Sequence, residues 1–432
     1  MTPHDHASED HLSPCEGTEG SVRLVTFGCR LNIYESAVIK DHAKKAGLEN
    51  AIIVNTCAVT NEAVQKARQA IRRARRENPG ARIIVTGCAA QVAPAGFANM
   101  PEVNQVIGND LKLKAEVWRG SLTERVQVND IMQVKETAIH MISGFDSHAR
   151  AFVQVQNGCD HRCTFCIIPY GRGNSRSVAM GEIVEQVRKL VAGGYQEIVL
   201  TGVDITSYGP DLPGQPTLGQ MTRRLLALVP EIKRLRLSSL DPVEIDDDLW
   251  RLIGEEPRVM PHLHLSMQAG DDMILKRMKR RHLRQDLFAV CEKARKLRPD
   301  MVFGADIIAG FPTETHKMFD NTFDAVKACG LTFLHVFPYS PRQGTPAARM
   351  PQVDGNVRKE RAKKLRELGG SLLHQHLSVL VGKTLPVLTE RNNKGRTEYF
   401  SEVAIDGNIP AGRIVMMKMN SVEGGRLKGC VC

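Results

Sequence analysis

Long apolar runs are missing from this sequence. No stretch of its 432 residues approaches the roughly 20 apolar residues that cross a bilayer, and no charged-then-apolar leader opens the chain. We therefore expect neither a membrane protein nor a secreted one, but a protein of the reducing cytoplasm. In that compartment the eleven cysteines, which are spread through the chain, are expected as metal ligands rather than disulfides.

An acidic balance is missing as well, because the net charge is +10 and the isoelectric point is near 9.1. Charge of this sign favours a polyanionic partner, although many basic proteins have none. The length allows two or three domains, each with its own core. Residues 1–20 are polar and rich in histidine and acid, so we expect a disordered tail there.

A fourth cysteine is missing next to Cys159, Cys163 and Cys166, which we call the loop trio. Their C-x₃-C-x₂-C spacing is one thiolate short of the four that close an iron–sulfur cubane, so one iron would stay open to another molecule. A zinc knuckle and three structural thiols are the alternatives. Zinc would require a fourth ligand at short range, and the nearest histidine, His161, lies inside the triplet. The spacing therefore favours a cluster with an open iron.

Residues 21–135 alternate short β-branched runs with charged helical stretches, which predicts a parallel α/β sheet. Cys29, Cys57 and Cys88, which we call the sheet trio, each follow one of three predicted strands. The carboxyl ends of parallel strands lie along one edge, so these cysteines should converge although 28 and 31 residues separate them. Three ordinary buried cysteines are the alternative. The repeated position favours a second three-thiolate cluster.

Residues 147–375 contain six strand-then-helix units, which predict a partial (β/α)₆ barrel with its chemistry at the carboxyl ends of the strands. His262 and His264 share one strand face, either as a core pair or as ligands. Polar and turn residues at the strand ends outline a pocket, although capping is the alternative for each: Thr201, Asp204, Ser238, Ser239, Gln268, Gly310 and Glu314.

Residues 378–432 change to alternating strands with Gly and Asn turns, which predict a small antiparallel β-barrel. The segment carries a modest excess of basic residues. Cys430 and Cys432 close the chain, and we expect them to be unordered thiols.

The loop trio, with the aromatic Phe165 before its last cysteine, resembles the signature of the radical S-adenosylmethionine (SAM) enzymes. The runs GCRLNIYES, VNTCAVTNEA and VTGCAAQ resemble the amino-terminal domain of the methylthiotransferases, a branch of that superfamily. The likeness covers nearly all of the chain after residue 20. It implies two [4Fe–4S] clusters, SAM on the open iron of the loop trio, and sulfur handling at the sheet trio. The terminal barrel is similar to a TRAM domain, an RNA-binding module.

The resemblance also implies contacts with SAM. Thr201 and Gly202 match positions at the methionine end of SAM, and Ile307 and Gly310 match positions near its adenine, with Phe165 across from them. Asp204 and Ala269 depart from the family pattern. The residues expected to bind or adjoin the cofactor are Phe165, Thr201, Gly202, Ser239, Gln268, Ile307, Gly310 and Arg342.

Among methylthiotransferases, the first two cysteine motifs and the QNGCDHRCTFC block look most similar to the branch acting on N6-threonylcarbamoyladenosine at position 37 of the tRNA anticodon loop. In that branch a 5′-deoxyadenosyl radical removes hydrogen from adenine C2, sulfur is inserted, and a second SAM provides the methyl group. An external electron donor and a sulfur source are implied, and the sequence identifies neither.

Three alternatives stay open at this point. The target of a methylthiotransferase is N6-isopentenyladenosine in tRNA for one sister branch and a ribosomal-protein aspartate for another. A different class is a non-enzymatic RNA-binding iron–sulfur protein, which would more often have four protein ligands on each cluster. Basic stretches at 72–76 and 276–284 fit an RNA partner, but they also fit solvated helix faces.

Overall fold

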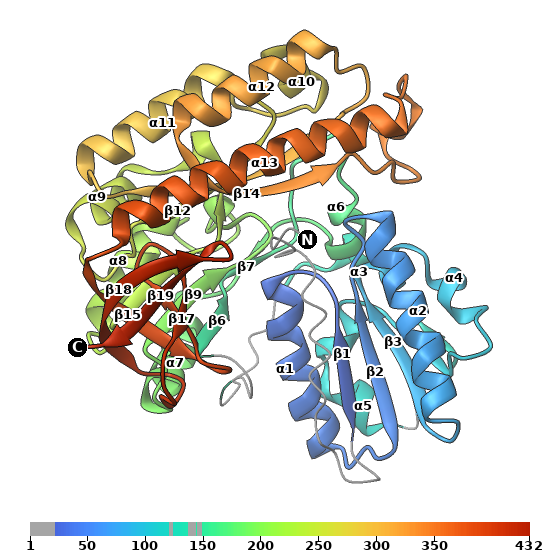
Figure 1. Cartoon of the computed structure of the whole chain (residues 1–432). Coiled ribbons are helices and arrows are strands. Elements are labelled where there is room, and N and C mark those ends of the chain that lie inside the picture. The colour runs from blue at the N-terminus through green and yellow to red at the C-terminus, as the bar shows by residue number, and fades with distance from the viewer. Residues whose placement is uncertain (1–21, 121–123, 137–143, 145–148) are drawn as a thin grey trace.

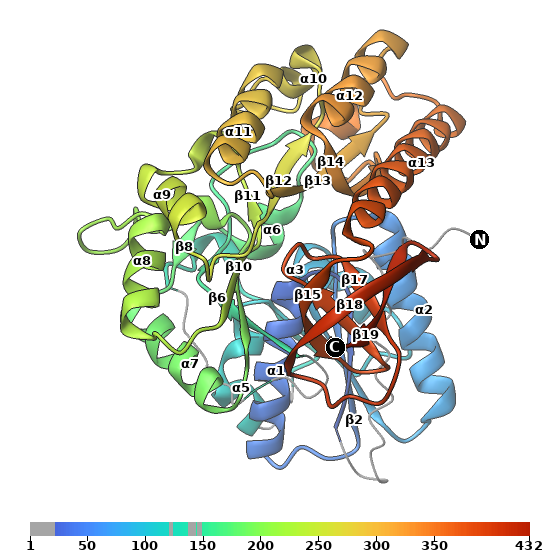
Figure 2. The same ribbon diagram turned by 60° about the vertical axis from the view of Figure 1, so that its left-hand side comes forward.

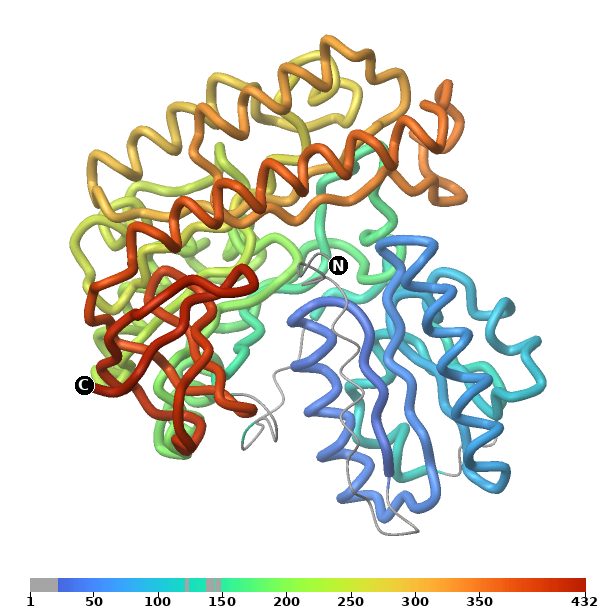
Figure 3. Tube along the Cα trace, viewed as in Figure 1, coloured from blue at the N-terminus to red at the C-terminus, as the bar shows by residue number. Residues whose placement is uncertain are grey.

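The computed structural model describes residues 22–120, 124–136, 144 and 149–432. The predicted tail at 1–20 lies outside the described residues. Figure 3 shows an amino-terminal unit in blue and a carboxyl-terminal barrel in red, with a larger central unit between them in sequence. Within the described residues, no helix combines the length and apolar character that a bilayer span requires.

The amino-terminal unit is a five-stranded sheet in the order β1-β2-β3-β4-β5, and all of its pairings are parallel. Ile52 and Val54 pack into one apolar cluster and Ile53 into another, so both faces of the sheet are covered. The prediction of a parallel α/β sheet is confirmed. Its strands are β1 (Arg23–Thr26), β2 (Ala51–Thr56), β3 (Arg82–Gly87), β4 (Gln105–Ile107) and β5 (Val126–Gln127).

Two of the helices in this unit begin at cysteines of the sheet trio. Cys29 is the residue before α1, and Cys88 is the first residue of α3. The intervening α2 begins conventionally, because the Thr60 hydroxyl accepts a hydrogen bond from the Ala63 amide at 3.1 Å. The helices are α1 (Arg30–Lys45), α2 (Asn61–Glu77), α3 (Cys88–Val92), α4 (Pro94–Ala98) and α5 (Ala115–Arg119), with 3-10 helices η1 (Leu111–Leu113) and η2 (Ile131–Gln133).

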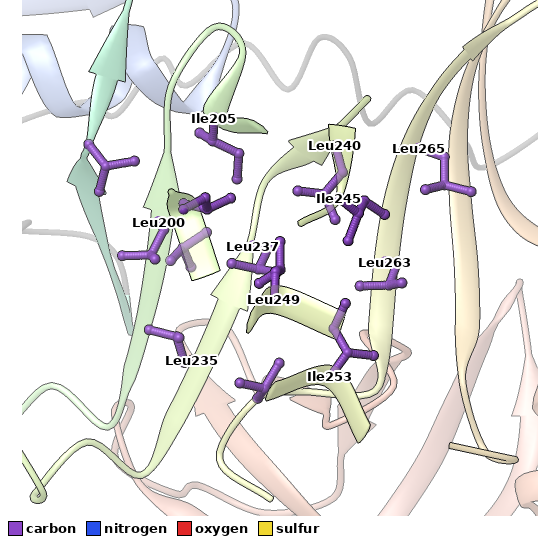
Figure 4. Packing of buried hydrophobic residues seen from close by; sticks show 14 of the residues in the cluster. Leu200, Ile205, Leu235, Leu237, Leu240, Ile245, Leu249, Ile253, Leu263 and Leu265 are labelled. Atoms are coloured by element: carbon purple, nitrogen blue, oxygen red, sulfur yellow. The ribbon is translucent and has the colours of Figure 1, made fainter. Parts of the chain in front are cut away.

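The central unit has parallel strands in two sheets, β10-β9-β6 and β11-β12-β13-β14. Only Ser238 separates β10 from β11, so six strand positions follow one another as in an open barrel. Leucine side chains of β9, β10 and β12 pack with isoleucine side chains of the segments that follow β9 and β11 (Figure 4). The strands are β6 (Arg150–Gln154), β9 (Glu197–Thr201), β10 (Arg234–Leu237), β11 (Ser239–Leu240), β12 (His262–Gln268), β13 (Val302–Ala309) and β14 (Leu331–Pro338).

Helices follow these strands along the chain, as the predicted (β/α)₆ barrel requires. They are α7 (Met180–Ala192), α8 (Leu218–Leu228), α9 (Asp247–Glu255), α10 (Asp272–Arg277), α11 (Arg284–Leu297), α12 (His316–Cys329) and α13 (Gly355–Leu380), with 3-10 helices η3 (Ile205–Ser207), η4 (Pro242–Glu244) and η5 (Pro346–Arg349). Figure 2 shows α7, α8 and α9 along the outer side of the strands. The loop trio lies in an excursion after β6, which also contains α6 (Ile168–Arg172) and the short pair β7 (Gln156–Asn157) and β8 (Arg176–Ser177).

The carboxyl-terminal unit is a closed barrel in the order β15-β16-β17-β19-β18. Its pairings are antiparallel except that of β17 with β19, which is parallel. Cys430 lies in β19, where it pairs with Lys418 of β18. The expectation of an unordered thiol at this position was therefore wrong. The strands are β15 (Thr384–Glu390), β16 (Lys394–Thr397), β17 (Glu402–Ile405), β18 (Ile414–Glu423) and β19 (Arg426–Val431).

The barrel is fixed to the central unit by buried arginines of β10. Arg234 donates to the Pro386 carbonyl at 2.7 Å, and Arg236 donates to the carbonyls of Thr397 and Glu398 at 2.8 and 2.9 Å. The helix α13 also continues without a break from the central unit to the barrel (Figure 1). Because both connections involve buried or continuous structure, the barrel has a fixed position at the amino-terminal ends of β6, β10 and β12, where its residues contact Arg150, Arg234 and His262.

Candidate active site

All three units line one cavity of about 1380 Å³, which we call the central cavity. Residues of both cysteine trios lie on its wall, although the two trios are far apart in sequence. They are Cys29, Cys57, Cys159, Cys163 and Cys166. The sixth cysteine, Cys88, is 3 % exposed and does not line the cavity. The structure therefore places the two predicted cluster sites on the same internal space.

The sheet trio forms as predicted at the carboxyl edge of β1, β2 and β3. The Cys57 sulfur lies 3.0 Å from where a Cβ on Gly28 would be, so it adjoins the turn that carries Cys29. Burial raises the pKa of the Cys57 thiol to about 12, with further contributions from Cys88 and Cys29. The Asn109 amide donates to the Cys88 sulfur at 3.5 Å.

The loop trio is held by backbone hydrogen bonds to its surroundings. The Cys159 amide donates to the Gly173 carbonyl at 3.1 Å, and the Thr164 amide donates to the Met278 carbonyl at 3.0 Å. Gly158 has a φ of +72°, and a Cβ there would lie 1.8 Å from the Asn174 oxygen. The close approach of two backbone segments therefore requires glycine at the start of this loop.

The donor atoms of each trio fit an iron–sulfur cluster. All cysteines in the described residues are free. Burial raises the pKa of Cys166 to about 12 and also raises that of Cys159, where Asp204 adds to the effect. Neighbouring thiolates in a buried site repel one another, whereas bound iron deprotonates its thiol ligands and provides the missing positive charge. Each trio offers three sulfur ligands and would leave one iron of a cubane for a molecule that is not protein.

Arg172 connects the two trios physically. It belongs to α6, shortly after the loop trio, and its guanidinium donates to Glu35 of α1 at 2.7 Å and to Asn32 at 2.6 Å. Lys112 donates to the same Glu35 carboxylate at 2.7 Å, and all three charged side chains are buried. Burial alone would raise the pKa of Glu35, but Arg172 and Lys112 outweigh it and hold that pKa below its usual value. Sequence analysis did not identify this network, because its members have no local pattern.

Five of the residues predicted to contact SAM line the central cavity: Phe165, Thr201, Gly202, Ser239 and Gln268. A Cβ on Gly202 would lie 2.9 Å from Oε1 of Gln156. The same oxygen accepts hydrogen bonds from the backbone amides of Val203 and Asp204. The chain after β9 therefore turns too tightly there for a larger residue. Phe165 contacts Phe311 edge to face, with ring centroids 6.4 Å apart.

The structure does not bring the other three predicted residues to this cavity. Ile307 is fully buried in the core, and its neighbour Ile308 lines the cavity instead. Gly310 faces α13, because a Cβ there would lie 2.4 Å from Arg358. Burial lowers the pKa of Arg342 and Cys57 opposes this shift, which places Arg342 beside the sheet trio.

Glu314 of the same turn does not line the cavity, and it has the capping role that was the alternative for it. Its carboxylate is buried, where it accepts hydrogen bonds from the Gly310 amide at 2.9 Å and from Arg361 of α13 at 2.7 Å. Glu314 therefore ties the turn after β13 to the last helix of the core.

Charged groups surround the loop trio. Arg280 donates to the Cys163 sulfur at 3.7 Å and to the Asp241 carboxylate at 2.7 Å. Asp204, which departs from the family pattern, lies 3.9 Å from the Cys159 sulfur. The same carboxylate oxygen, Oδ2, lies 3.1 Å from Nε2 of His161. Hydrogen bonds and charges at cluster sulfurs influence reduction potential, so these side chains are positioned to tune a bound cluster.

Asp306 also lines the central cavity, where it accepts hydrogen bonds from two histidines. Its Oδ1 lies 3.1 Å from Nε2 of His264 and 3.2 Å from Nδ1 of His335. His262, which the sequence places on the same strand face, instead stacks on Phe400 of the barrel with centroids 4.9 Å apart. His262 and His264 therefore have different surroundings, although both line the central cavity.

Phe400 is surrounded by arginines from all three units, which sequence analysis missed. Their guanidinium carbons lie between 4.6 and 5.8 Å from the ring centroid, and they are Arg30, Arg150, Arg236 and Arg396. Such positions allow cation–π attraction. The four arginines come from positions up to 366 residues apart, between Arg30 and Arg396, so no sequence motif indicated them.

Comparison with known proteins agrees with this geometry. Residues 153–326 match the Radical SAM superfamily, and residues 21–108 match the uncharacterized protein family UPF0004. A solved radical SAM methyltransferase, TsrM from Kitasatospora setae, is 16 % identical, with a TM-score of 0.52 over 73 % of this chain and 67 % of that one. At this identity the likeness concerns the fold alone.

Relatives of full length are more informative. The chain is 55 % identical to the threonylcarbamoyladenosine tRNA methylthiotransferase MtaB of Rickettsia prowazekii, over 94 % of this chain and 96 % of that protein. It is 35 % identical to the MtaB of Bacillus subtilis, over 92 % and 93 %. A tRNA-2-methylthio-N(6)-dimethylallyladenosine synthase from Maricaulis maris is 32 % identical, over 93 % and 96 %. The chain therefore belongs to the radical SAM methylthiotransferase family, among its MtaB-type members.

Proposed function

We propose that this protein methylthiolates tRNA, converting N6-threonylcarbamoyladenosine at position 37 of the anticodon loop to its 2-methylthio derivative. The observation that carries the proposal is the opening of both cysteine trios onto one cavity, in a chain 55 % identical to an MtaB over nearly its full length. A base between the trios would face a source of radicals on one side and of sulfur on the other.

In this proposal Cys159, Cys163 and Cys166 hold one [4Fe–4S] cluster and Cys29, Cys57 and Cys88 hold the other. When bound, the clusters and SAM provide the one-electron chemistry and the sulfur and methyl transfer. The side chains of the protein orient these groups. Arg280 fixes Cys163 from one side of the loop, and Phe165, Thr201, Gly202, Ser239 and Gln268 form the wall nearest the loop trio.

The division into domains follows from the same scheme. We assign residues 21–135 to the sheet trio, 147–375 to the radical SAM core and 378–432 to a TRAM-like module that contacts RNA. The terminal barrel supplies Arg391, Lys394, Arg396 and Arg426 to the cavity wall, a cationic composition suited to phosphates. The reducing equivalents and the replacement sulfur come from outside the chain, in the cytoplasm.

The test is reconstitution. The iron-loaded protein, SAM, a chemical reductant and an anticodon stem-loop RNA bearing threonylcarbamoyladenosine should yield the 2-methylthio nucleoside by mass spectrometry. Cys159→Ala should abolish formation of 5′-deoxyadenosine, whereas Cys88→Ala should retain it and lose methylthiolation. Absence of the 2-methylthio product with the wild-type protein, despite 5′-deoxyadenosine formation, would overturn the substrate assignment.

A further inference from the structure

Arg30 differs from the other arginines around Phe400 in having no anionic partner of its own. Arg236 pairs with Glu197 at 2.7 Å, Arg150 with Glu390 at 3.2 Å, and Arg396 with Glu390 and Glu402 at 3.4 and 3.5 Å. Among the described residues, Arg30 forms neither an ion pair nor a hydrogen bond through its side chain. A guanidinium group presents five N–H donors, so this one is equipped to bind an anion that the protein does not provide.

The charges nearby leave room for such an anion. Four guanidinium groups surround Phe400, and three carboxylates pair with them: Glu197, Glu390 and Glu402. Glu402 is shared further with Lys394 at 3.7 Å and Arg426 at 3.4 Å. Asp306 also faces Arg30, but its carboxylate accepts from His264 and His335. The wall of the cavity therefore carries an excess of positive charge next to Arg30.

Arg30 also has a defined position relative to the chemistry. It directly follows Cys29 of the sheet trio, begins α1, and lines the central cavity. In adenine, C2 and C6 flank the same ring nitrogen, so a substituent on N6 lies on the same edge of the base as the carbon that reacts. When C2 faces the sheet trio, the N6 substituent therefore lies close to residues that adjoin the trio.

The threonylcarbamoyl group ends in a free carboxylate, whereas a dimethylallyl group on the same nitrogen is apolar. We propose that Arg30 binds the carboxylate of the threonylcarbamoyl group and thereby selects this nucleoside over adenosines whose N6 substituent has no charge. The inference rests on the proposed function. Arg150 and Arg396, with Glu390 and Phe400, act as positioning residues that hold this wall of the cavity.

The test removes the charge from each partner in turn. Two anticodon stem-loop RNAs are compared, one with threonylcarbamoyladenosine and one with its carboxylate converted to the primary amide. With wild-type protein, the amide should lower kcat/KM by about tenfold to a hundredfold, as loss of a charge-assisted hydrogen bond does. With Arg30→Gln the two RNAs should react at the same rate within about twofold, and Arg30→Lys should restore part of the preference.

Binding without turnover is a second measurement. Dissociation constants of both RNAs, measured by fluorescence anisotropy in the absence of SAM, should show the same preference in the wild type and its loss in Arg30→Gln. The matched control is Arg426→Gln, which removes another cation of the cavity wall and should raise the dissociation constants of both RNAs by the same factor. Iron content and 5′-deoxyadenosine formation establish that each variant retains its clusters.

The outcomes separate the two levels of the proposal. An equal loss of affinity and of kcat/KM for both RNAs in Arg30→Gln would mean that Arg30 contacts the phosphate backbone or supports the fold. This result would overturn the inference. An unchanged preference in Arg30→Gln would also overturn it. Both outcomes leave the proposed function intact, which fails only if the wild-type protein does not methylthiolate the threonylcarbamoyl RNA.

Discussion

The two cysteine trios offer the same three sulfur ligands but are assembled in different ways. Cys159, Cys163 and Cys166 lie within eight residues of one loop, whereas Cys29, Cys57 and Cys88 meet only because three parallel strands end at one edge. The loop trio depends on local backbone geometry, and the sheet trio depends on the register of a whole domain. Substitutions that disturb tertiary structure should therefore affect the sheet trio first.

The largest effect should come from Gly87→Ala. Gly87 has a φ of +97°, and a Cβ there would lie 2.3 Å from the Thr56 oxygen, so the alanine must displace the end of β3 and Cys88 with it. We expect a cost of about 3 kcal/mol and loss of about half of the iron, with 5′-deoxyadenosine formation retained. Iron analysis and chemical denaturation measure both.

The matched control for this substitution is Gly47→Ala. Gly47 has a φ of +64°, but no atom lies within 4 Å of the position that a Cβ would take, so only the backbone strain of about 1 kcal/mol should appear. A Gly87→Ala protein with its full iron content would show that the sheet trio is as locally determined as the loop trio.

The next largest effect should come from Arg172→Met, which removes the connection between the trios. The substitution leaves Glu35 paired with Lys112, but the buried oxygens of Glu35 and Asn32 lose the hydrogen bonds that Arg172 donates, which costs about 2 kcal/mol. Chemical denaturation of the protein should show this loss. In the control Arg188→Met, an exposed arginine bonded to the Leu228 carbonyl is removed, and stability should change by less than about 1 kcal/mol.

A smaller effect should follow from pH. Because the folded-state pKa of Glu35 is below its usual value of 4.5, its contribution to stability is present above that pH and is lost as the pH falls below it. The free energy of unfolding of the iron-free protein should therefore decline below about pH 4.5. Glu35→Gln should be less stable at neutral pH and should lose part of this decline. An identical decline in both proteins would contradict the assignment.

The smallest effect should come from Arg162→Ala, on the outer side of the loop trio. Arg162 is exposed, and it donates to the Cys159 carbonyl and to Asn174, both at 2.7 Å. Exposed polar contacts contribute little, so we expect a change below about 1 kcal/mol and 5′-deoxyadenosine formation within about twofold of wild type. A large loss of SAM cleavage would show that the loop is held from outside rather than by its backbone.

Much of the architecture was predictable, because both signals involved were periodic. Alternating strands and helices indicated the parallel sheet and the partial barrel, and equivalent positions after strands indicated the sheet trio. The contacts expected with SAM were harder to predict. Successive residues of a strand face opposite sides, so the choice between Ile307 in the core and Ile308 on the cavity depends on a register that the motif does not reveal.

The sequence by itself determined the family and predicted both cysteine trios, because thiolate spacing and strand-end positions are properties of the chain. Only the tertiary structure decided what surrounds them. Arg172 meets Glu35 across 137 residues, and Arg30 meets Phe400 of the terminal barrel at 5.8 Å. Such pairs have no periodicity or local spacing, because they arise where separately folded units pack together. The side chains that distinguish one substrate from another are therefore those that the sequence alone could not identify.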